Sequence, residues 1–211
     1  KELFIARDAL GVKPLFYSQS DNGFSFASEI AALSPLGVSF KHLNFDALKN
    51  YITFLWSPGE GTIAQNVKKL NPGHAIIIKN GEIYKSWQWF ALPTLRNKPK
   101  PPKHLNFVTE VDRLLKKAVF KQMISDVPVG AFLSGGLDSS ALVNFARELN
   151  PNLECFTIDN IGGPDQGVTN DLPYAKKVAS HLNVNLNIVK VNALDISKAL
   201  EDMVMRLGEP L

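Results

Sequence analysis

The sequence predicts an α/β protein in two parts, a mainly β segment followed by a parallel sheet with crossover helices. Three observations lead to this fold class. The first 92 residues hold short apolar runs separated by Asn-Gly turns, residues 93–104 carry four prolines, and from residue 105 helical and strand patterns alternate. Strands that alternate with helices favour parallel pairing, because each helix supplies the crossover between neighbouring strands.

In residues 1–92, two hairpins are expected. Asp21-Asn22-Gly23 and Lys79-Asn80-Gly81 each stand between apolar runs, and Asn-Gly accepts the positive φ angles of a type I′ turn. Residues 46–51 resemble a short helix with Asn44 as its cap, and the Arg7-Asp8 pair is expected to fix a turn. Because two hairpins without neighbours cannot close a full core, this part is expected to be incomplete.

Residues 93–104 read as an extended, proline-rich linker, which separates residues 1–92 from residues 105–211. The chain starts on Lys1 without a lead-in and stops just after a helix. We therefore expect it to be an internal fragment of a longer protein.

The second part shows one regular alternation of elements. Apolar residues recur at helical spacing in its helices, and its strands are short continuous apolar runs. The expected order is a helix at 111–119, a strand at 129–133, a helix at 142–149, a strand at 153–158, a helix at 174–182, a strand at 184–189 and a helix capped by Asp195 and ending at Leu207.

Composition excludes several classes of protein. Hydrophobic residues make up 45% and charged residues 20%, as in ordinary globular proteins, and a net charge of +3 is too small to indicate nucleic acid. No apolar run approaches the roughly 18–20 residues of a membrane span. Cys155 is the only cysteine, so no internal disulfide can form, which fits a cytoplasmic setting. Its apolar neighbours indicate a buried thiol rather than a nucleophile.

One motif carries chemistry. Ser134-Gly135-Gly136-Leu137-Asp138-Ser139-Ser140 joins the strand at 129–133 to the following helix, at the strand end where ligands bind in such sheets. Glycines allow close backbone approach, and hydroxyls with free N–H groups at a helix start suit anionic oxygens. Asp138 would repel phosphate unless Mg²⁺ bridged the two, so it is the candidate metal ligand.

Other interpretations of this loop are weaker. It could simply cap the helix, as many Ser- and Gly-rich βα loops do. It is not a Walker loop, since no Lys-Ser or Lys-Thr closes it, and it lacks the third glycine of a dinucleotide fingerprint.

The loop resembles the pyrophosphate-binding loop of the ATP pyrophosphatase superfamily, and residues 125–130, Ser-Asp-Val-Pro-Val-Gly, narrow the resemblance to the asparagine synthetase family. Three segments of the first part, residues 7–17, 27–30 and 69–74, resemble the closing part of that family's glutaminase domain. The resemblance implies an adenine nucleotide alpha hydrolase-like, Rossmann-like fold for residues 105–211. For residues 1–92 it implies the remnant of an Ntn-type αββα glutamine amidotransferase type-2 domain.

The resemblance also implies a reaction. Glutamine is hydrolysed at a cysteine upstream of the chain, a substrate carboxylate attacks the α-phosphate of ATP, and ammonia displaces AMP. ATP and Mg²⁺ are the implied cofactors, glutamine and aspartate the implied substrates, and a homodimer is an assembly it allows. ATP binding is carried over to Leu133, Ser134, Gly135, Gly136, Leu137, Asp138, Ser139, Ser140 and Ile158, with Leu133 and Ile158 at positions that hold adenine.

Three points stay open at this stage. Leu133 and Ile158 can also be explained as ordinary strand core. The family often has a carboxylate pair before the Tyr-Ala of the 174–182 helix, whereas here only Asp165 and Asp171 are nearby. The amidated carboxylate could belong to aspartate, to a sugar or peptide, or to an intramolecular substrate as in β-lactam synthetases, and a non-catalytic nucleotide-binding homologue is a further alternative.

Overall fold

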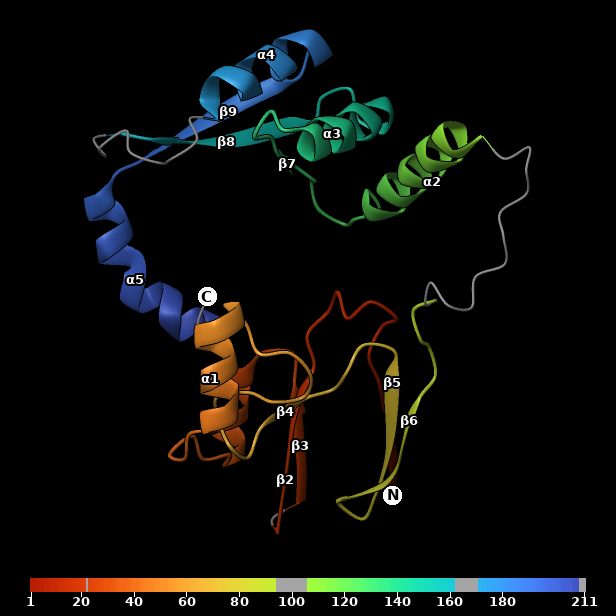
Figure 1. Cartoon of the computed structure of the whole chain (residues 1–211), viewed down its shortest axis with the longest axis vertical. Helices are drawn as coiled ribbons and strands as arrows, with labels where there is room; N and C mark the ends of the chain where they lie inside the picture. The colour runs from red at the N-terminus through yellow and green to blue at the C-terminus, as the bar shows by residue number, and fades with distance from the viewer. Residues whose placement is uncertain (22, 94–105, 162–170, 209–211) are drawn as a thin grey trace. The chain divides into compact units, whose positions relative to one another are not determined.

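The computed structural model describes residues 1–21, 23–93, 106–161 and 171–208. The fold is of mixed α/β character, with helices and small sheets of strands, most of which Figure 1 labels. The chain divides into two compact units, residues 1–98 with 199–211 and residues 99–198, and each is treated by itself below. The predicted linker at 93–104 lies outside the described residues, apart from Pro93.

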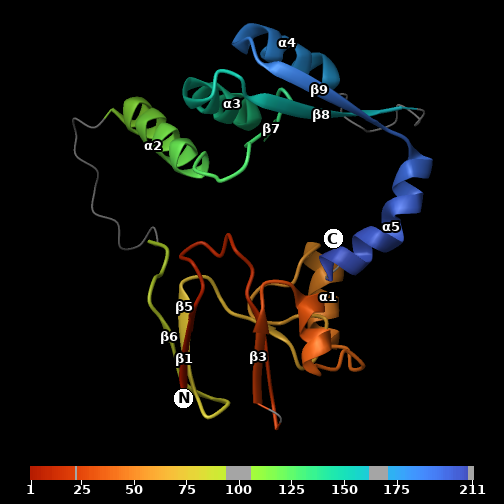
Figure 2. The ribbon, with the colours of Figure 1, turned by 180° about the vertical axis from the view of Figure 1, so that it is seen from behind.

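One sheet of the first unit contains β1 (Glu2–Ala6), β5 (His74–Lys79) and β6 (Glu82–Gln88), paired antiparallel in the order β1-β5-β6. Figure 2 labels the three strands and shows them side by side. Asn80 and Gly81 connect β5 to β6 with φ angles of 53° and 86°. The hairpin predicted from Asn-Gly is therefore confirmed, with positive φ at both turn positions.

The other sheet of this unit has the order β3-β2-β4, formed by β2 (Phe16–Ser20), β3 (Gly23–Ala27) and β4 (Lys68–Lys69). The predicted hairpin between β2 and β3 is confirmed, although its turn residue 22 lies outside the described residues. Two elements were not predicted. Strand β4 is too short to show alternation, and the 3₁₀-helix η1 (Ile30–Leu36) has Pro35 within it.

Helix α1 (Phe45–Phe54) confirms the predicted helix and its cap. The Asn44 side chain accepts a hydrogen bond from the backbone N–H of Ala47 at 3.2 Å, which satisfies one donor of the first turn. Ala47 and Tyr51, one turn apart, are its buried residues. The helix ends at Leu55, whose φ of 61° turns the chain away from the helical path.

Arg7 fixes the chain that leaves β1. Its guanidinium donates to the carbonyls of Lys13 at 2.9 Å, Gly11 at 2.9 Å and Leu70 at 2.7 Å. The bond to Leu70 ties this turn to a distant part of the sequence. A planar guanidinium with several donors is suited to such a role, which a lysine could not fill.

Asp8 fixes the same turn from its acidic side. Its carboxylate accepts the backbone N–H groups of Leu10, Val12 and Lys13. These bonds, those from Lys13 and Val12 foremost, lower the pKa of Asp8. The prediction that Arg7 and Asp8 together fix a turn is therefore confirmed.

Strand β2 serves two hydrophobic clusters because successive side chains point to opposite faces. Tyr17 belongs to one cluster and its neighbour Phe16 to the other. The buried members of the first are Ile5, Tyr17, Leu70, Ile76 and Ile78; those of the second are Phe16, Ile30, Leu33, Ala64 and Val67.

The second unit contains the predicted parallel sheet. Strands β7 (Ala131–Phe132), β8 (Glu154–Asn160) and β9 (Asn185–Val191) pair in parallel in the order β7-β8-β9. The strand expected at 129–133 is shorter than predicted, because β7 pairs only with Cys155 and Phe156. The chain then turns away, although the N–H of Leu133 still donates to the carbonyl of Phe156 at 2.8 Å.

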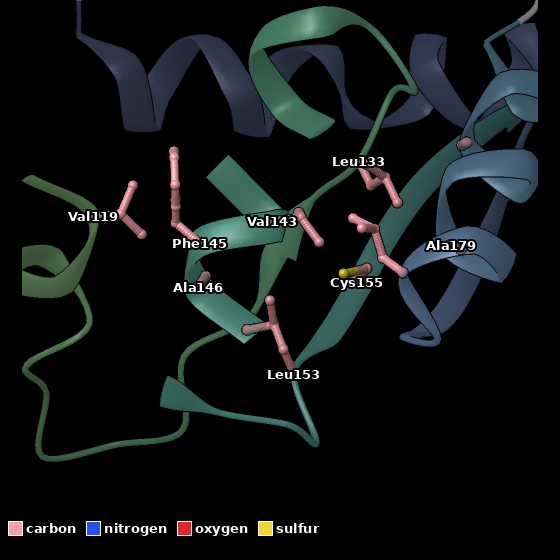
Figure 3. Packing of buried hydrophobic residues seen from close by; sticks show 10 residues of the cluster. Val119, Leu133, Val143, Phe145, Ala146, Leu153, Cys155 and Ala179 are labelled. Carbon is pink, nitrogen blue, oxygen red and sulfur yellow. The ribbon is translucent and has the colours of Figure 1, made fainter. Parts of the chain in front are cut away.

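Helices α2 (Phe107–Gln122), α3 (Leu137–Leu149) and α4 (Leu172–Leu182) all contribute to the core of this unit. Cys155, on β8, has no exposed surface, and Figure 3 shows it with Val143 and Leu133 in this core. The buried members are Val119, Leu133, Val143, Phe145, Ala146, Leu153, Cys155, Ala175, Ala179 and Leu182. Helices α3 and α4 therefore pack on the face of β8 that carries Cys155.

Helix α5 (Ala193–Leu207) begins before Asp195, so the prediction that Asp195 caps it was wrong. The Asp195 carboxylate instead reaches back to the N–H of Asn192 at 3.2 Å, while the Asn192 side chain accepts the N–H of Asp195 at 2.9 Å. This reciprocal pair is a capping box with Asn192 at the cap position. A single residue read as the cap was in fact the second half of a two-residue motif.

Among the helices that the structure describes, none combines the length and the apolar character required to cross a membrane.

Candidate functional site

The predicted motif lies where expected, between the end of β7 and the start of α3. Leu133 follows β7, Gly136 occupies the cap position of α3, and Leu137 is the first helical residue. The loop therefore stands at the carboxyl edge of a parallel sheet, the place where ligands bind in open α/β folds. Asp138 lies in the first turn of the helix.

Gly135 requires the absence of a side chain. Its φ of 81° lies in the left-handed region, and a Cβ on it would meet the carbonyl carbon of Tyr174 at 2.4 Å and the backbone nitrogen of Ala175 at 2.5 Å. No alternative rotamer can relieve a contact with backbone atoms. Both the positive φ and the close contact with the start of α4 therefore require glycine at position 135.

Gly136 differs from its neighbour. Its φ of −71° is open to any residue, and the nearest atom to a Cβ there is the Ser134 hydroxyl oxygen at 3.4 Å. Two adjacent glycines therefore have distinct roles: Gly135 makes a left-handed turn that has no space for a side chain, whereas Gly136 only keeps the helix start uncovered.

Hydroxyl groups brace the loop from within. The N–H of Gly136 donates to the Ser134 hydroxyl at 3.3 Å, and the hydroxyls of Ser134 and Ser139 lie 3.0 Å apart. The Ser139 hydroxyl also donates to the Gly136 carbonyl at 3.3 Å, so Ser134 is the donor in a consistent set. The Ser140 hydroxyl turns back to the same carbonyl at 2.6 Å.

The first turn of α3 presents free donors. Its first intrahelical bond runs from the N–H of Ser140 to the carbonyl of Gly136. The N–H groups of Leu137, Asp138 and Ser139 precede that bond and have no acceptor within the part of the chain that the structure describes. With the positive end of the helix dipole, these three donors form a cradle suited to an anion.

Asp138 is the one charged side chain of the loop and is exposed. No group of three or more His, Cys, Asp and Glu side chains able to hold a metal occurs in residues 1–21, 23–93, 106–161 and 171–208. Mg²⁺ is commonly held by one or two carboxylates together with substrate phosphates and waters, rather than by a protein cage. One exposed carboxylate beside an anion cradle fits that mode of binding.

The structure does not bring the side chains of Leu133 and Ile158 to one surface. Leu133 is only 1% exposed and belongs to the core beneath α3 and α4, whereas Ile158 is 53% exposed. Along β8, Cys155 and Thr157 are buried, so Ile158 points to the opposite face. Of the two residues assigned to adenine, only Ile158 offers side-chain surface.

The other candidates have structural explanations or lie outside the description. Cys155 is buried, and burial, followed by the charge of Glu154, raises the pKa of its thiol. It was predicted to be a buried thiol, which the structure confirms. Asp171 occupies the cap position of α4 without a side-chain cap bond, and Asp165 lies outside the described residues.

Sequence reasoning missed the start of α4 as part of this site. Tyr174 and Ala175 provide the backbone against which Gly135 sits, yet Tyr174 was read only as a residue of the helix pattern. The sequence did offer a signal. In a parallel sheet, the helix that follows the second strand starts at the same edge of the sheet as the helix that follows the first strand.

Two families match the chain. Residues 110–211 match the asparagine synthase family, and residues 1–89 match the glutamine amidotransferase domain family.

Curated relatives match along the whole chain. An asparagine synthetase [glutamine-hydrolyzing] 1 of Bacillus subtilis is 34% identical over 99% of this chain and 32% of its own length. A putative asparagine synthetase [glutamine-hydrolyzing] 2 of Methanocaldococcus jannaschii is 37% identical over 99% of this chain and 40% of its own. The amidase chry2 of Gibberella zeae is 25% identical over 100% of this chain and 33% of its own. The chain thus spans between about a third and two fifths of the length of these relatives.

Proposed function

The chain belongs to the asparagine synthetase family, and from that premise we propose that its Ser134–Ser140 loop binds the phosphates of ATP during ATP-dependent amide synthesis. Residues 105–211 would form the synthetase part. Residues 1–92 would belong to a glutamine amidotransferase type-2 domain of the Ntn kind, and residues 93–104 would link the two.

One observation carries the proposal, namely the shape of the loop around Gly135 and Gly136. The left-handed turn at Gly135 leads the chain into α3, where the N–H groups of Leu137, Asp138 and Ser139 have no acceptor among the described residues. Three converging donors at a helix start suit a group with several anionic oxygens, such as pyrophosphate. A loop that merely capped the helix would use its side chains on these donors, whereas the Ser134 hydroxyl accepts from Gly136 instead.

The serine hydroxyls would hold the loop in its binding conformation before the anion arrives. Ser134 and Ser139 already brace each other, so the cradle would not need to form when the anion arrives. Such preorganisation stabilises developing charge more than flexible groups do. In the proposed reaction that charge develops on the pyrophosphate as it leaves.

Mg²⁺ would be held by Asp138 together with phosphate oxygens. The ion supplies positive charge that neutralises the phosphates and offsets the repulsion from the carboxylate. The chain's own contribution is the placement of Asp138 in the first turn of α3, next to the free N–H groups. This arrangement would make nucleotide binding dependent on both the metal and the carboxylate.

The proposed chemistry is the amidation of a carboxylate. The substrate carboxylate attacks the α-phosphate of ATP, pyrophosphate departs toward the loop, and ammonia from glutamine displaces AMP to form the amide. The names of the relatives favour aspartate as the acceptor and asparagine as the product. The similarity to an amidase keeps a second acceptor in consideration, a carboxylate other than that of aspartate.

A titration with ATP·Mg²⁺ tests the loop. In the protein encoded by the complete open reading frame that contains this chain, the double variant Ser134→Ala/Asp138→Ala should bind ATP·Mg²⁺ at least about tenfold more weakly. The variant removes a charged group and a hydroxyl that braces the loop. The matched control is Ser180→Ala/Asp112→Ala, a serine and an aspartate exposed on α4 and α2. Equal affinity of the folded double variant and the wild type would refute nucleotide binding by this loop.

A further inference from the structure

The loop is in contact with a second helix that carries positive charge. A Cβ at Gly135 would also stand 2.6 Å from the Cβ of Tyr174, so the Tyr174 side chain starts at the loop. The Tyr174 side chain is 61% exposed and lies in the first turn of α4. The start of α4 therefore borders the loop on the side of Gly135.

The cradle itself lacks a cation. Among the seven residues of the loop the one charged side chain is Asp138, which is negative. A triphosphate carries several negative charges, and a carboxylate close to it adds electrostatic repulsion. The free N–H groups and one metal ion do not balance all the negative charges of the triphosphate and Asp138, so a further positive group near the loop would favour binding.

Lys177 is a cationic side chain that extends toward Tyr174, the residue that contacts the loop at Gly135. Its Nζ lies 5.9 Å from the centre of the Tyr174 ring, so the side chain runs from the second turn of α4 back toward the first. This direction is the usual one, because side chains on a helix tilt toward its N-terminus. Lys177 takes part in no ion pair within the part of the chain that the structure describes.

We propose that Lys177, guided by the Tyr174 ring, donates from its Nζ to a phosphate oxygen of the nucleotide bound at the Ser134–Ser140 loop. This assignment rests on the proposed function and adds a residue that no loop motif contains. An ammonium acts as a mobile point charge, which suits a phosphate that departs during the reaction. A lysine from the second crossover helix would thereby take the role that the closing lysine has in a Walker loop.

The neighbouring Lys176 provides a matched control. It is exposed on the same helix and bears the same charge, but lies about 100° further round the helix axis. A general effect of net charge on nucleotide binding would make the two variants alike. A specific contact would separate them.

The experiment is a calorimetric titration of the protein that the complete open reading frame encodes, first with ATP·Mg²⁺ and separately with inorganic pyrophosphate·Mg²⁺. Lys177→Ala should weaken both by about three- to tenfold, Lys176→Ala by less than about twofold, and Lys177→Arg should keep most of the affinity. The salt dependence of binding should also become shallower in Lys177→Ala alone, because one ionic contact is lost.

The outcomes separate this inference from the proposed function. If the wild type binds ATP·Mg²⁺ and Lys177→Ala binds it equally well, or if both lysine variants lose affinity equally, the role of Lys177 is refuted while the loop keeps its own. If the folded wild type binds neither ATP nor pyrophosphate, both proposals are refuted. Thermal unfolding at the wild-type midpoint verifies that each variant is folded.

Discussion

Gly135 lies directly against the backbone of Tyr174, so closely that a Cβ on the glycine would stand 2.4 Å from the carbonyl carbon of the tyrosine. This contact joins the loop after β7 to the start of α4. The loop is therefore shaped by two helices of the parallel unit, α3 through its cap and α4 through its backbone.

Gly135→Ala should abolish nucleotide binding while Gly136→Ala leaves it within a few-fold of wild type. The first substitution puts a Cβ into backbone atoms at a positive φ and costs about 1–3 kcal/mol or a displaced loop. The second adds a Cβ at an ordinary φ with 3.4 Å to its nearest neighbour. ATP·Mg²⁺ titration and thermal unfolding of both variants measure the difference.

The opposite order would contradict the account of the two glycines. If Gly136→Ala is the more damaging, close approach of the anion to Gly136 matters more than the turn at Gly135. If neither changes binding, the loop is not the site of the phosphates.

Short-range signals allowed much of the fold to be predicted from the sequence. Asn80-Gly81 marked a hairpin because few other pairs accept two positive φ angles, and Asn44 marked a helix start through its side-chain acceptor. The alternation of helices and strands likewise indicated a parallel sheet, which the structure confirms; the strand order β7-β8-β9 comes from the structure alone.

Long-range and very short features could not be predicted in this way. The seat of Gly135 on Tyr174 depends on the packing of α4 against the sheet, which no local pattern records. The opposite facing of Leu133 and Ile158 depends on strand register, since one residue of offset exchanges the two faces. Strand β4 has two residues, which leaves no alternation to detect.

Cys155 should be unreactive in the folded protein. Its thiol is fully buried and its pKa is raised, so the thiolate that reacts with disulfide reagents is scarce. A chromogenic disulfide reagent should label it only after addition of denaturant, with a rate that follows unfolding. Rapid labelling under native conditions would contradict the burial of β8 in this core.

Asp8 should make the stability of the chain depend on pH. Its pKa is lowered from the ordinary 3.8 by backbone N–H donors, so its stabilising effect is complete above that value and disappears as pH falls through the lowered pKa. Asp8→Asn should lower the urea midpoint at about pH 7 and reduce its decline toward about pH 3. Asp21→Asn, an exposed aspartate beside the β2–β3 turn, is the control and should leave the acid decline as in wild type.

The central claim is that Asp138 helps to hold Mg²⁺ on the phosphates of ATP, and Asp138→Asn tests it most directly. Pyrophosphate release and glutamate release are measured separately on one preparation of the protein that the complete open reading frame encodes, with Asp112→Asn on α2 as the control. The account predicts that Asp138→Asn loses Mg²⁺-dependent pyrophosphate release by at least about a hundredfold while glutamate release from glutamine persists, because the carboxylate serves only the synthetase reaction. Pyrophosphate release within a few-fold of wild type would show that Asp138 is no metal ligand and that the loop is a helix cap.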